Sequence, residues 1–247
     1  MPSFHHGKST AVVYGIREFS DSLREASRSR TADVGDTTAF GSSFKSSLIG
    51  TLDTKVELGG LFSSTSGGAD QILNSYFSSA NPGPLIIAEQ GLSDGAKAFG
   101  LEVHQVSYQI QGSVSDVVST SISLQGNGFS GDGNILQYGT LSASANGTTL
   151  NSGISGGTDF GAWATLINLA NTRSTDVDVK IQHSVDGSTW ADLASFTTIS
   201  TSSLVSYETV EVAAAASTPR QYLRTVHTLA AGTGSFKSLV FLARKTF

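Results

Sequence analysis

Cysteine is absent from this 247-residue sequence, and long apolar runs are absent too. Without cysteine the chain forms no disulfide, ligates no zinc through sulfur and has no thiol nucleophile, and its redox compartment stays undecided. No stretch approaches the roughly 20 apolar residues of a membrane span. The N-terminal segment MPSFHHGKSTAVVYG also lacks the apolar core of a signal peptide. We therefore expect a protein made in a cytoplasm that does not insert into a membrane.

Charged side chains are also scarce. They make up 14% of the residues, against about 25% in an average soluble domain. Lys and Arg total 15 and Asp and Glu total 20, for a net charge of −5. This balance offers no basic face for neutralising phosphates, so we expect no tight binding to nucleic acid. A weakly charged surface causes little repulsion between copies, which is typical of a subunit that assembles.

What the sequence does have is apolar–polar alternation with the period of a β-strand. VDVKIQH at 177–183 places its three aliphatic side chains on one face. LEVHQVSYQI at 101–110 shifts phase after Val103, which predicts a β-bulge that keeps Val106 and Ile110 on the inner face. Further strands are predicted at 55–62, 85–88, 118–126, 135–141, 161–169, 193–199, 204–212, 221–229 and 236–243.

Two segments depart from this alternation. Residues 67–83 carry apolar side chains at helical spacing and end at Asn81-Pro82, which predicts one short helix at 69–80. Residues 142–159 are rich in Gly, Ser, Asn and Thr, as linkers are.

The predicted fold class is therefore mainly β, with two domains. The first is a β-sandwich or barrel with one short helix, and the second is a small β-sandwich of immunoglobulin-like or jelly-roll-like type. The expected boundaries are 1–145 for the first domain, 146–154 for the linker and 155–247 for the second domain.

Candidate catalytic motifs are weak. Ser42 and Lys45 have the S-x-x-K spacing of serine-acylating enzymes, but the partner motifs of that class are missing. Gly7-Lys8-Ser9 resembles the end of a phosphate-binding loop, yet no strand and no earlier glycine precede it as that loop requires. A chain this rich in serine matches such short patterns by chance. We expect no catalytic residue, no cofactor and no enzyme activity.

Histidines and tryptophans admit more than one interpretation. His104, His183 and His227 fall on separate predicted strands without a carboxylate at ligand spacing, so we expect no metal site. Trp163 and Trp190 lie in the second domain, where aromatic side chains either fill the core or stack on sugar rings at the surface. The core interpretation is favoured, and surface contacts with glycans stay open as an alternative.

The most specific pattern lies in residues 14–62, read as strand, short turn, strand, the stretch DTTAFGSSFKSSLIG, and a strand that ends in VELGGLF. This order resembles the tail tube (major tail) proteins of long-tailed bacteriophages. The matching residues are Asp36, Thr37, Thr38, Phe40, Gly41, Lys45, Gly50, Thr51, Leu52, Asp53 and Val56 to Phe62. The resemblance extends over about residues 10–142. Ala39 and Gly59-Gly60 depart from the family pattern.

The resemblance implies a virion structural protein whose copies form stacked rings, hexameric in that family, around a channel through which DNA passes without specific binding. It implies location in the virion tail after synthesis in the host cytoplasm. The implied partners are other copies of the chain and the tape measure, tail terminator and distal tail proteins. Host-surface glycans are a further partner if the second domain is displayed outside. A capsid decoration protein, a minor tail protein and a carbohydrate-binding adhesion module remain alternatives.

In the family the long loop between early strands reaches the next ring, and here that loop is expected at 36–50. Its glycine and serine residues let the backbone lie close to a neighbour, and its phenylalanines are expected to become buried only when another chain arrives. The predicted contact residues are Asp36, Thr37, Thr38, Phe40, Gly41, Phe44, Lys45 and Leu48.

Overall fold

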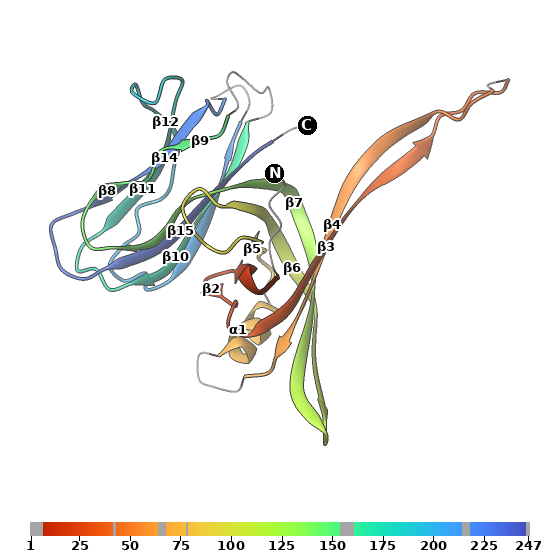
Figure 1. Cartoon of the computed structure of the whole chain (residues 1–247), viewed down its shortest axis with the longest axis horizontal. Coiled ribbons are helices and arrows are strands. Elements are labelled where there is room, and N and C mark those ends of the chain that lie inside the picture. Colours follow the sequence, from red (N-terminus) through yellow and green to blue (C-terminus); the bar gives the residue numbers. More distant parts are fainter. Residues whose placement is uncertain are drawn as a thin grey trace. The chain divides into compact units, whose positions relative to one another are not determined.

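The computed structural model describes residues 7–41, 43–63, 68–77, 79–153, 161–213 and 218–245. These residues form a mainly β structure with antiparallel sheets and the α-helix α1 (Ala69–Phe77), which confirms the predicted fold class (Figure 1). The chain makes two compact units, each built from separate segments. Unit 1 contains Met1–Asp21, Gly83–Glu102 and Phe129–Phe247, and unit 2 contains Ser22–Pro82 and Val103–Gly128.

The remaining elements follow in chain order. They are η1 (Gly7–Ser9), β1 (Ala11–Tyr14), β2 (Arg17–Glu18), β3 (Leu23–Asp36), β4 (Ser47–Leu61), β5 (Gly83–Ala88), β6 (Lys97–Ser113), β7 (Asp116–Leu141), β8 (Ala145–Asn146), β9 (Leu150–Asn151), β10 (Ala162–Asn171), β11 (Val177–Ser184), β12 (Ala191–Ser195), β13 (Ser206–Val212), β14 (Tyr222–Leu229) and β15 (Phe236–Arg244). The strands β6 and β7 each run from one unit into the other.

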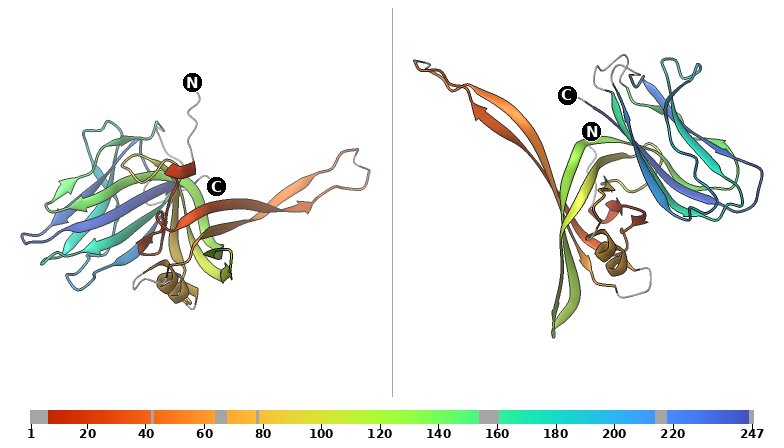
Figure 2. Two further views of the ribbon diagram at one scale, coloured as in Figure 1. Left: turned by 60° about the horizontal axis from the view of Figure 1, so that its bottom comes forward. Right: turned by 180° about the vertical axis from the view of Figure 1, so that it is seen from behind.

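Unit 1 contains a β-sandwich. One layer is the part of a ten-stranded sheet with the strand order β13-β10-β15-β7, and that sheet continues through β6, β5, β1 and β2. The facing sheet has the order β12-β11-β14-β8, with β9 also paired to β14. Figure 2 shows the ribbon from two further sides. Between the sheets lies a core that includes Leu136, Leu166, Val179, Leu223 and Val240. Every strand predicted between 161 and 243 is present, with ends shifted by a few residues.

The sheet that contains β15 is covered on both faces. Leu242 belongs to the core inside the sandwich, whereas Phe241 belongs to a second core that also includes Trp163, Val13 and Ile86. All residues of β15 except Lys237 and Arg244 are buried. This explains why FKSLVFLAR has a nearly continuous apolar run in place of strict alternation.

The compact units differ from the division expected at residues 146–154. β7 pairs with β15 from Gly133↔Ala243 to Leu141↔Phe236, so hydrogen bonds join residues on both sides of the expected linker. Within that linker, β8 and β9 both pair with β14. Glycine and serine therefore occur here in short edge strands of the sandwich as well as in turns.

Unit 2 is built around two long β-hairpins, β3–β4 and β6–β7, which are joined through β4 and β7 (Figure 1). The register between β4 and β7 runs from Lys55↔Gln125 to Leu61↔Ser119. Since these strands are antiparallel, the end of β4 nearest its own hairpin loop is farthest from the turn of the other hairpin. The two hairpins therefore point in opposite directions along the strands.

The overlap of the two hairpins has a core. There Val56 lies opposite Leu124 and Leu58 lies opposite Ile122, and all four are buried. The helix α1 contributes Leu73, which is buried as well. The hydroxyl of Tyr108 on β6 donates a hydrogen bond to Asp70 of α1, which ties the helix to the sheet.

Two expectations for unit 2 need correction. The loop expected at 36–50 is shorter, because β3 continues to Asp36 and β4 begins at Ser47. The phase shift in β6 does not bring Val106 and Ile110 to the inside, since about half of each side chain is exposed. In the described part of unit 2, β6 therefore carries exposed apolar side chains.

Candidate assembly interface

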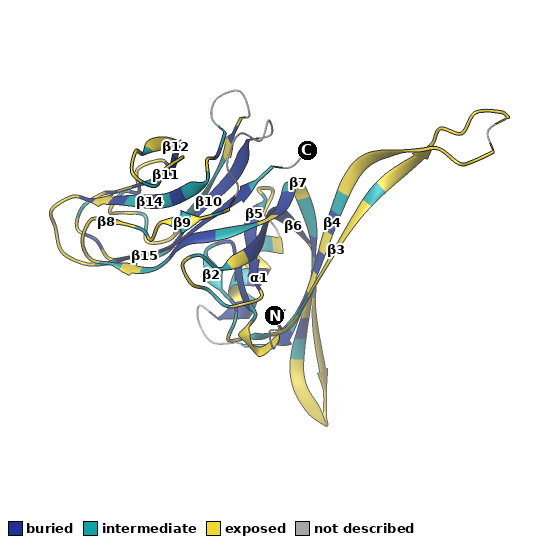
Figure 3. Cartoon of the chain, turned by 45° about the horizontal axis from the view of Figure 1, so that its top comes forward, coloured by how far each residue is buried: buried dark blue, intermediate teal, exposed yellow. Residues whose placement is uncertain are grey.

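The β3–β4 hairpin extends beyond the core of unit 2 and ends in a loop at 37–46, called the tip here (Figure 3). Around it, large apolar side chains are exposed. Val34 and Ile49 are 65% and 70% exposed, and they lie directly opposite each other on the two strands. Phe40 and Phe44 are almost fully exposed. An apolar surface of this kind is typical of a contact site for another chain.

Hydrogen bonds at its base fix the start and end of the tip. Thr37 N donates to Ser46 O at 2.9 Å, and Ser46 N donates to Thr38 Oγ1 at 3.0 Å. Asp36 Oδ1 accepts a bond from Thr38 N at 2.9 Å. The hydroxyl and the N–H of Thr38 hold the pKa of Asp36 below its usual value. The role of Asp36, Thr37 and Thr38 is thus to shape the loop. Direct contact with another chain is expected from the residues of the tip that follow Thr38.

The backbone turns at Gly41, whose φ is +90°. This conformation is strained for residues with a side chain, which explains a glycine between Phe40 and Phe44. Lys45 is exposed and is the only charged residue in 37–50. Of the eight predicted contact residues, Leu48 lies on β4 with 67% of its side chain exposed.

Sequence reasoning missed Val34, Ile49 and Leu52 as exposed apolar residues of the same hairpin. Ile49 was missed because the loop expected at 36–50 included it, whereas it lies on β4. The signal that would have found it is the direct continuation of the apolar pair Leu48-Ile49 into the alternation of β4.

The β3–β4 hairpin contains a bulge. The register shifts between Ala32 and Val34, and Asp33 Oδ2 accepts a 2.7 Å hydrogen bond from Thr51 Oγ1 across the strands. A bulge bends and twists a hairpin. It therefore sets the direction in which the outer third of the hairpin carries its apolar side chains.

At the opposite end of unit 2 lies a hollow where β3 begins, β4 ends and β7 begins. We call it the strand-end hollow; its lining residues are Arg24, Glu25, Gly59, Gly60, Leu61, Asp116, Val117, Ser119, Thr120 and Ser121. Nearby, the turn of the β6–β7 hairpin exposes Val114 completely and Val117 to 59%. Exposed apolar residues thus lie at both far ends of unit 2, where the ribbon of Figure 3 is coloured as exposed.

The residues of the motifs considered for catalysis and metal binding fall only partly within the described part of the chain. Ser42 of the S-x-x-K pair lies outside the described residues, as do His5 and His6. Among the described residues no group of three His, Asp or Glu side chains is placed to hold a metal ion. In the same part of the chain, no helix is long and apolar enough to cross a membrane.

Two of the histidines are buried inside the sandwich of unit 1. His183 on β11 and His227 on β14 are 4% and 1% exposed. Burial lowers the pKa of His227 to about 4. Burial, followed by the positive charge of Arg220, also lowers the pKa of His183. These side chains are buried as neutral core residues.

Trp163 is 2% exposed and packs edge-on against Phe241, with ring centroids 5.8 Å apart. Its core placement is confirmed, and a surface contact between Trp163 and a glycan is wrong. Trp190 is half-buried, and the guanidinium of Arg224 lies 4.1 Å from its ring centroid. Arg224 Nη2 also donates to Gln182 at 2.8 Å. One face of the Trp190 ring is therefore already covered by a side chain of the same unit.

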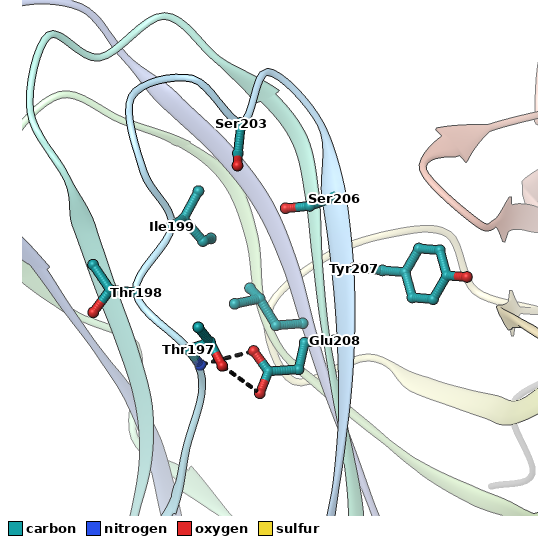
Figure 4. Close-up of a pocket in the computed structure, with 8 residues that line it drawn as sticks. Thr197, Thr198, Ile199, Ser203, Ser206, Tyr207 and Glu208 are labelled. Carbon is teal, nitrogen blue, oxygen red and sulfur yellow. Dashed lines mark hydrogen bonds between the residues drawn. The ribbon is translucent and has the colours of Figure 1, made fainter. Parts of the chain in front are cut away.

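A small pocket lies in unit 1 where the loop after β12 meets β13 (Figure 4). Glu208 points into it, and its carboxylate accepts bonds from Thr197 N at 2.7 Å and Thr197 Oγ1 at 3.2 Å. The side chain of Tyr207 points away on the other side of the strand (Figure 4). Since both oxygens of Glu208 bind Thr197, the carboxylate anchors the loop.

No protein-family model and no curated protein matches the chain. Among solved structures, a chain in the tail of an empty gene transfer agent particle is similar over 44% of this chain and 81% of its own, at 17% identity and a TM-score of 0.39. A chain in the virion of a native gene transfer agent particle covers 52% and 98%, at 15% identity and 0.42. The Dit hub protein of phage SPP1 covers 96% and 99%, at 11% identity and 0.37. With TM-scores below 0.5, these likenesses carry no conclusion about this chain.

Proposed function

We propose that this chain is a structural subunit of a phage tail, and specifically a tail tube subunit whose copies form rings that stack into a tube. The observation that carries the proposal is the β3–β4 hairpin, which exposes apolar side chains beyond the buried residues of β4. The order of elements in 14–62, which resembles tail tube proteins, supports the same function. The function is geometric and includes no chemical step.

The hairpin needs another chain for a physical reason. A two-stranded hairpin is marginally stable in water unless a further strand, helix or sheet covers it. In the described residues β3 pairs with β4 alone, and none of its 14 residues is buried. An edge strand of this length also offers unpaired N–H and C=O groups to a neighbour. Pairing with the sheet of the next copy in a ring would satisfy both needs at once.

The charge of the chain suits a channel for DNA. The net charge of −5 gives no general attraction for phosphates, so DNA would slide through a ring without being held. Other tail proteins, namely the tape measure, terminator and distal tail proteins, are the proposed partners at the two ends of such a tube.

Electron microscopy of the purified protein over a range of concentrations tests the proposal. We expect rings at low concentration and stacked rings or tubes at high concentration. Replacing Phe40 and Phe44 together by serine is expected to leave the subunit folded and to abolish stacking. Phe77→Ser is a suitable control, because Phe77 is also half-exposed but lies on α1, away from the tip. Monomers of the unchanged chain at every concentration would refute the proposed function.

A further inference from the structure

The tip and the strand-end hollow lie at opposite ends of unit 2. Along β4 the tip begins just before Ser47, and the hollow includes Gly59 to Leu61 near the other end of the same strand. A surface that projects at one end and a recess at the other end are the two halves of a head-to-tail contact, which repeats without closing on itself.

The two ends are complementary in polarity. Lys45 is the only charged residue in 37–50, and Asp116 is the only Asp, Glu, Lys or Arg in 103–128. Both are exposed, and each lies beside exposed apolar side chains, Phe44 next to Lys45 and Val117 next to Asp116. The hollow is also lined by Arg24 and Glu25, so its charged side chains sum to −1, opposite in sign to Lys45. Opposite charges at the two ends favour a contact that brings them together.

The hollow has a shape that a side chain can enter. Gly59 faces the same side of the sheet as Glu25 and Ser121, with which it pairs on the neighbouring strands. A Cβ at Gly59 would lie 3.5 Å from Glu25 Cβ. Glycine at this position adds no side chain of its own to the lining of the hollow beside Glu25.

We propose that the β3–β4 tip of one copy binds the strand-end hollow of a second copy, with Lys45 paired to Asp116 and Phe44 against Val117. The inference rests on the proposed stacking of rings and names the surface that receives the tip. Since β-strands rise about 3.3 Å per residue, Ser47 and Gly59 are about 40 Å apart along β4. If β4 lies parallel to the tube axis, copies joined in this way repeat at a spacing of about 40 Å.

A charge exchange tests the pairing. The single variants Lys45→Glu and Asp116→Lys each place like charges at every contact, so each alone is expected to need at least roughly tenfold more protein to form tubes. Mixing the two variants restores opposite charges at every contact in an alternating tube. We therefore expect the equimolar mixture to assemble like the unchanged chain, and the double variant Lys45→Glu, Asp116→Lys to do so by itself.

Lys97→Glu is the matched control, since Lys97 is exposed and lies in unit 1. It should assemble at the concentration of the unchanged chain. If both single variants assemble normally, or if the mixture stays unassembled, the pairing is wrong while the proposed function stands. If the unchanged chain forms no rings or tubes, the proposed function fails and the pairing fails with it.

Because the chain has no cysteine, introduced cysteines are its only thiols, and chemical crosslinking provides a second test. Ser43 and Ser115 are exposed neighbours of the tip and the hollow. In tubes of a Ser43→Cys, Ser115→Cys variant, a short bifunctional maleimide should give a ladder of linked chains on a denaturing gel. Either single variant should give no ladder. Dimers from Ser43→Cys alone would indicate contact between two tips and would overturn the head-to-tail assignment.

Discussion

The two units differ most clearly in how far their strands are buried, as a comparison of β15 with β3 shows. β15 in unit 1 is buried at every position except Lys237 and Arg244, with core residues on both faces. β3 in unit 2 is longer and has no buried residue. The stability of β15 comes from side chains of its own chain, whereas β3, among the described residues, pairs with β4 and has no buried residue. Unit 1 is complete within one chain, and we propose that unit 2 is completed by other copies.

The largest effect on this contrast is expected from Phe241→Ala. Phe241 is fully buried and packs against Trp163, so its truncation leaves a cavity and should lower the free energy of unfolding by about 3–5 kcal/mol. Both tryptophans lie in unit 1, so their fluorescence during urea unfolding reports this unit. Phe77→Ala, at a half-exposed position of unit 2, is the control. An equal loss of unfolding free energy in both variants would mean that the stability of unit 1 does not depend on its own core.

A comparable effect is expected from acid. The pKa of His227 is lowered to about 4 by burial, so the unfolded chain, with an ordinary pKa near 6.5, binds the proton more readily. Stability from the neutral ring is complete above about pH 6.5 and is lost as the pH falls towards 4, by about 3 kcal/mol in total. His183 acts in the same direction. Urea unfolding at several pH values measures this loss, and His227→Gln should flatten the slope between pH 6.5 and 4. An unchanged slope would rule out His227 as the cause.

Arg173→Met should have the next largest effect. The guanidinium of Arg173 is buried and donates to the carbonyls of Ser142, Ala230, Gly232 and Gly234. Methionine fills much of the space but leaves these acceptors without their donor, which should cost about 2–3 kcal/mol. Lys180→Met removes a more exposed charge on β11 and is expected to change stability by at most about 1 kcal/mol. Fluorescence-monitored urea unfolding separates the two outcomes, and equal stabilities of the two variants would show that the hydrogen bonds of Arg173 are dispensable.

The smallest effect on stability is expected at the tip. Phe40 and Phe44 are exposed, so replacing both by serine should change the free energy of unfolding by no more than about 0.5 kcal/mol. Circular dichroism during thermal unfolding, at a concentration where the chain is unassembled, measures this. A large destabilisation would show that the phenylalanines support the fold of the single chain, and would remove them as contact residues.

Sequence patterns predicted the elements of unit 1 well because its strands have buried faces. The alternation in VDVKIQH arises from Val177, Val179 and Ile181 facing the core, and all three are buried. The boundaries between units were harder to predict. Pairing of β7 with β15 joins residues far apart in sequence, and no local pattern around 142–153 indicates it.

The candidate site was predicted in part. The exposure of Phe40 and Phe44 agrees with the expected surface loop, yet the extension of β3 to Asp36 and the start of β4 at Ser47 were not found. Where both faces of a strand are exposed, as in β3, no apolar period distinguishes strand from loop. The strand-end hollow was missed for another reason, because it is formed by three strand ends that only the register brings together.

The chain passes several times between the two units, and this limits which fragments can contain a whole unit. The backbone crosses from one unit to the other at 21/22, 82/83, 102/103 and 128/129. Two of these crossings lie inside the continuous strands β6 and β7. No single truncation or cleavage yields either unit whole, and neither can be exchanged between genes as one uninterrupted segment.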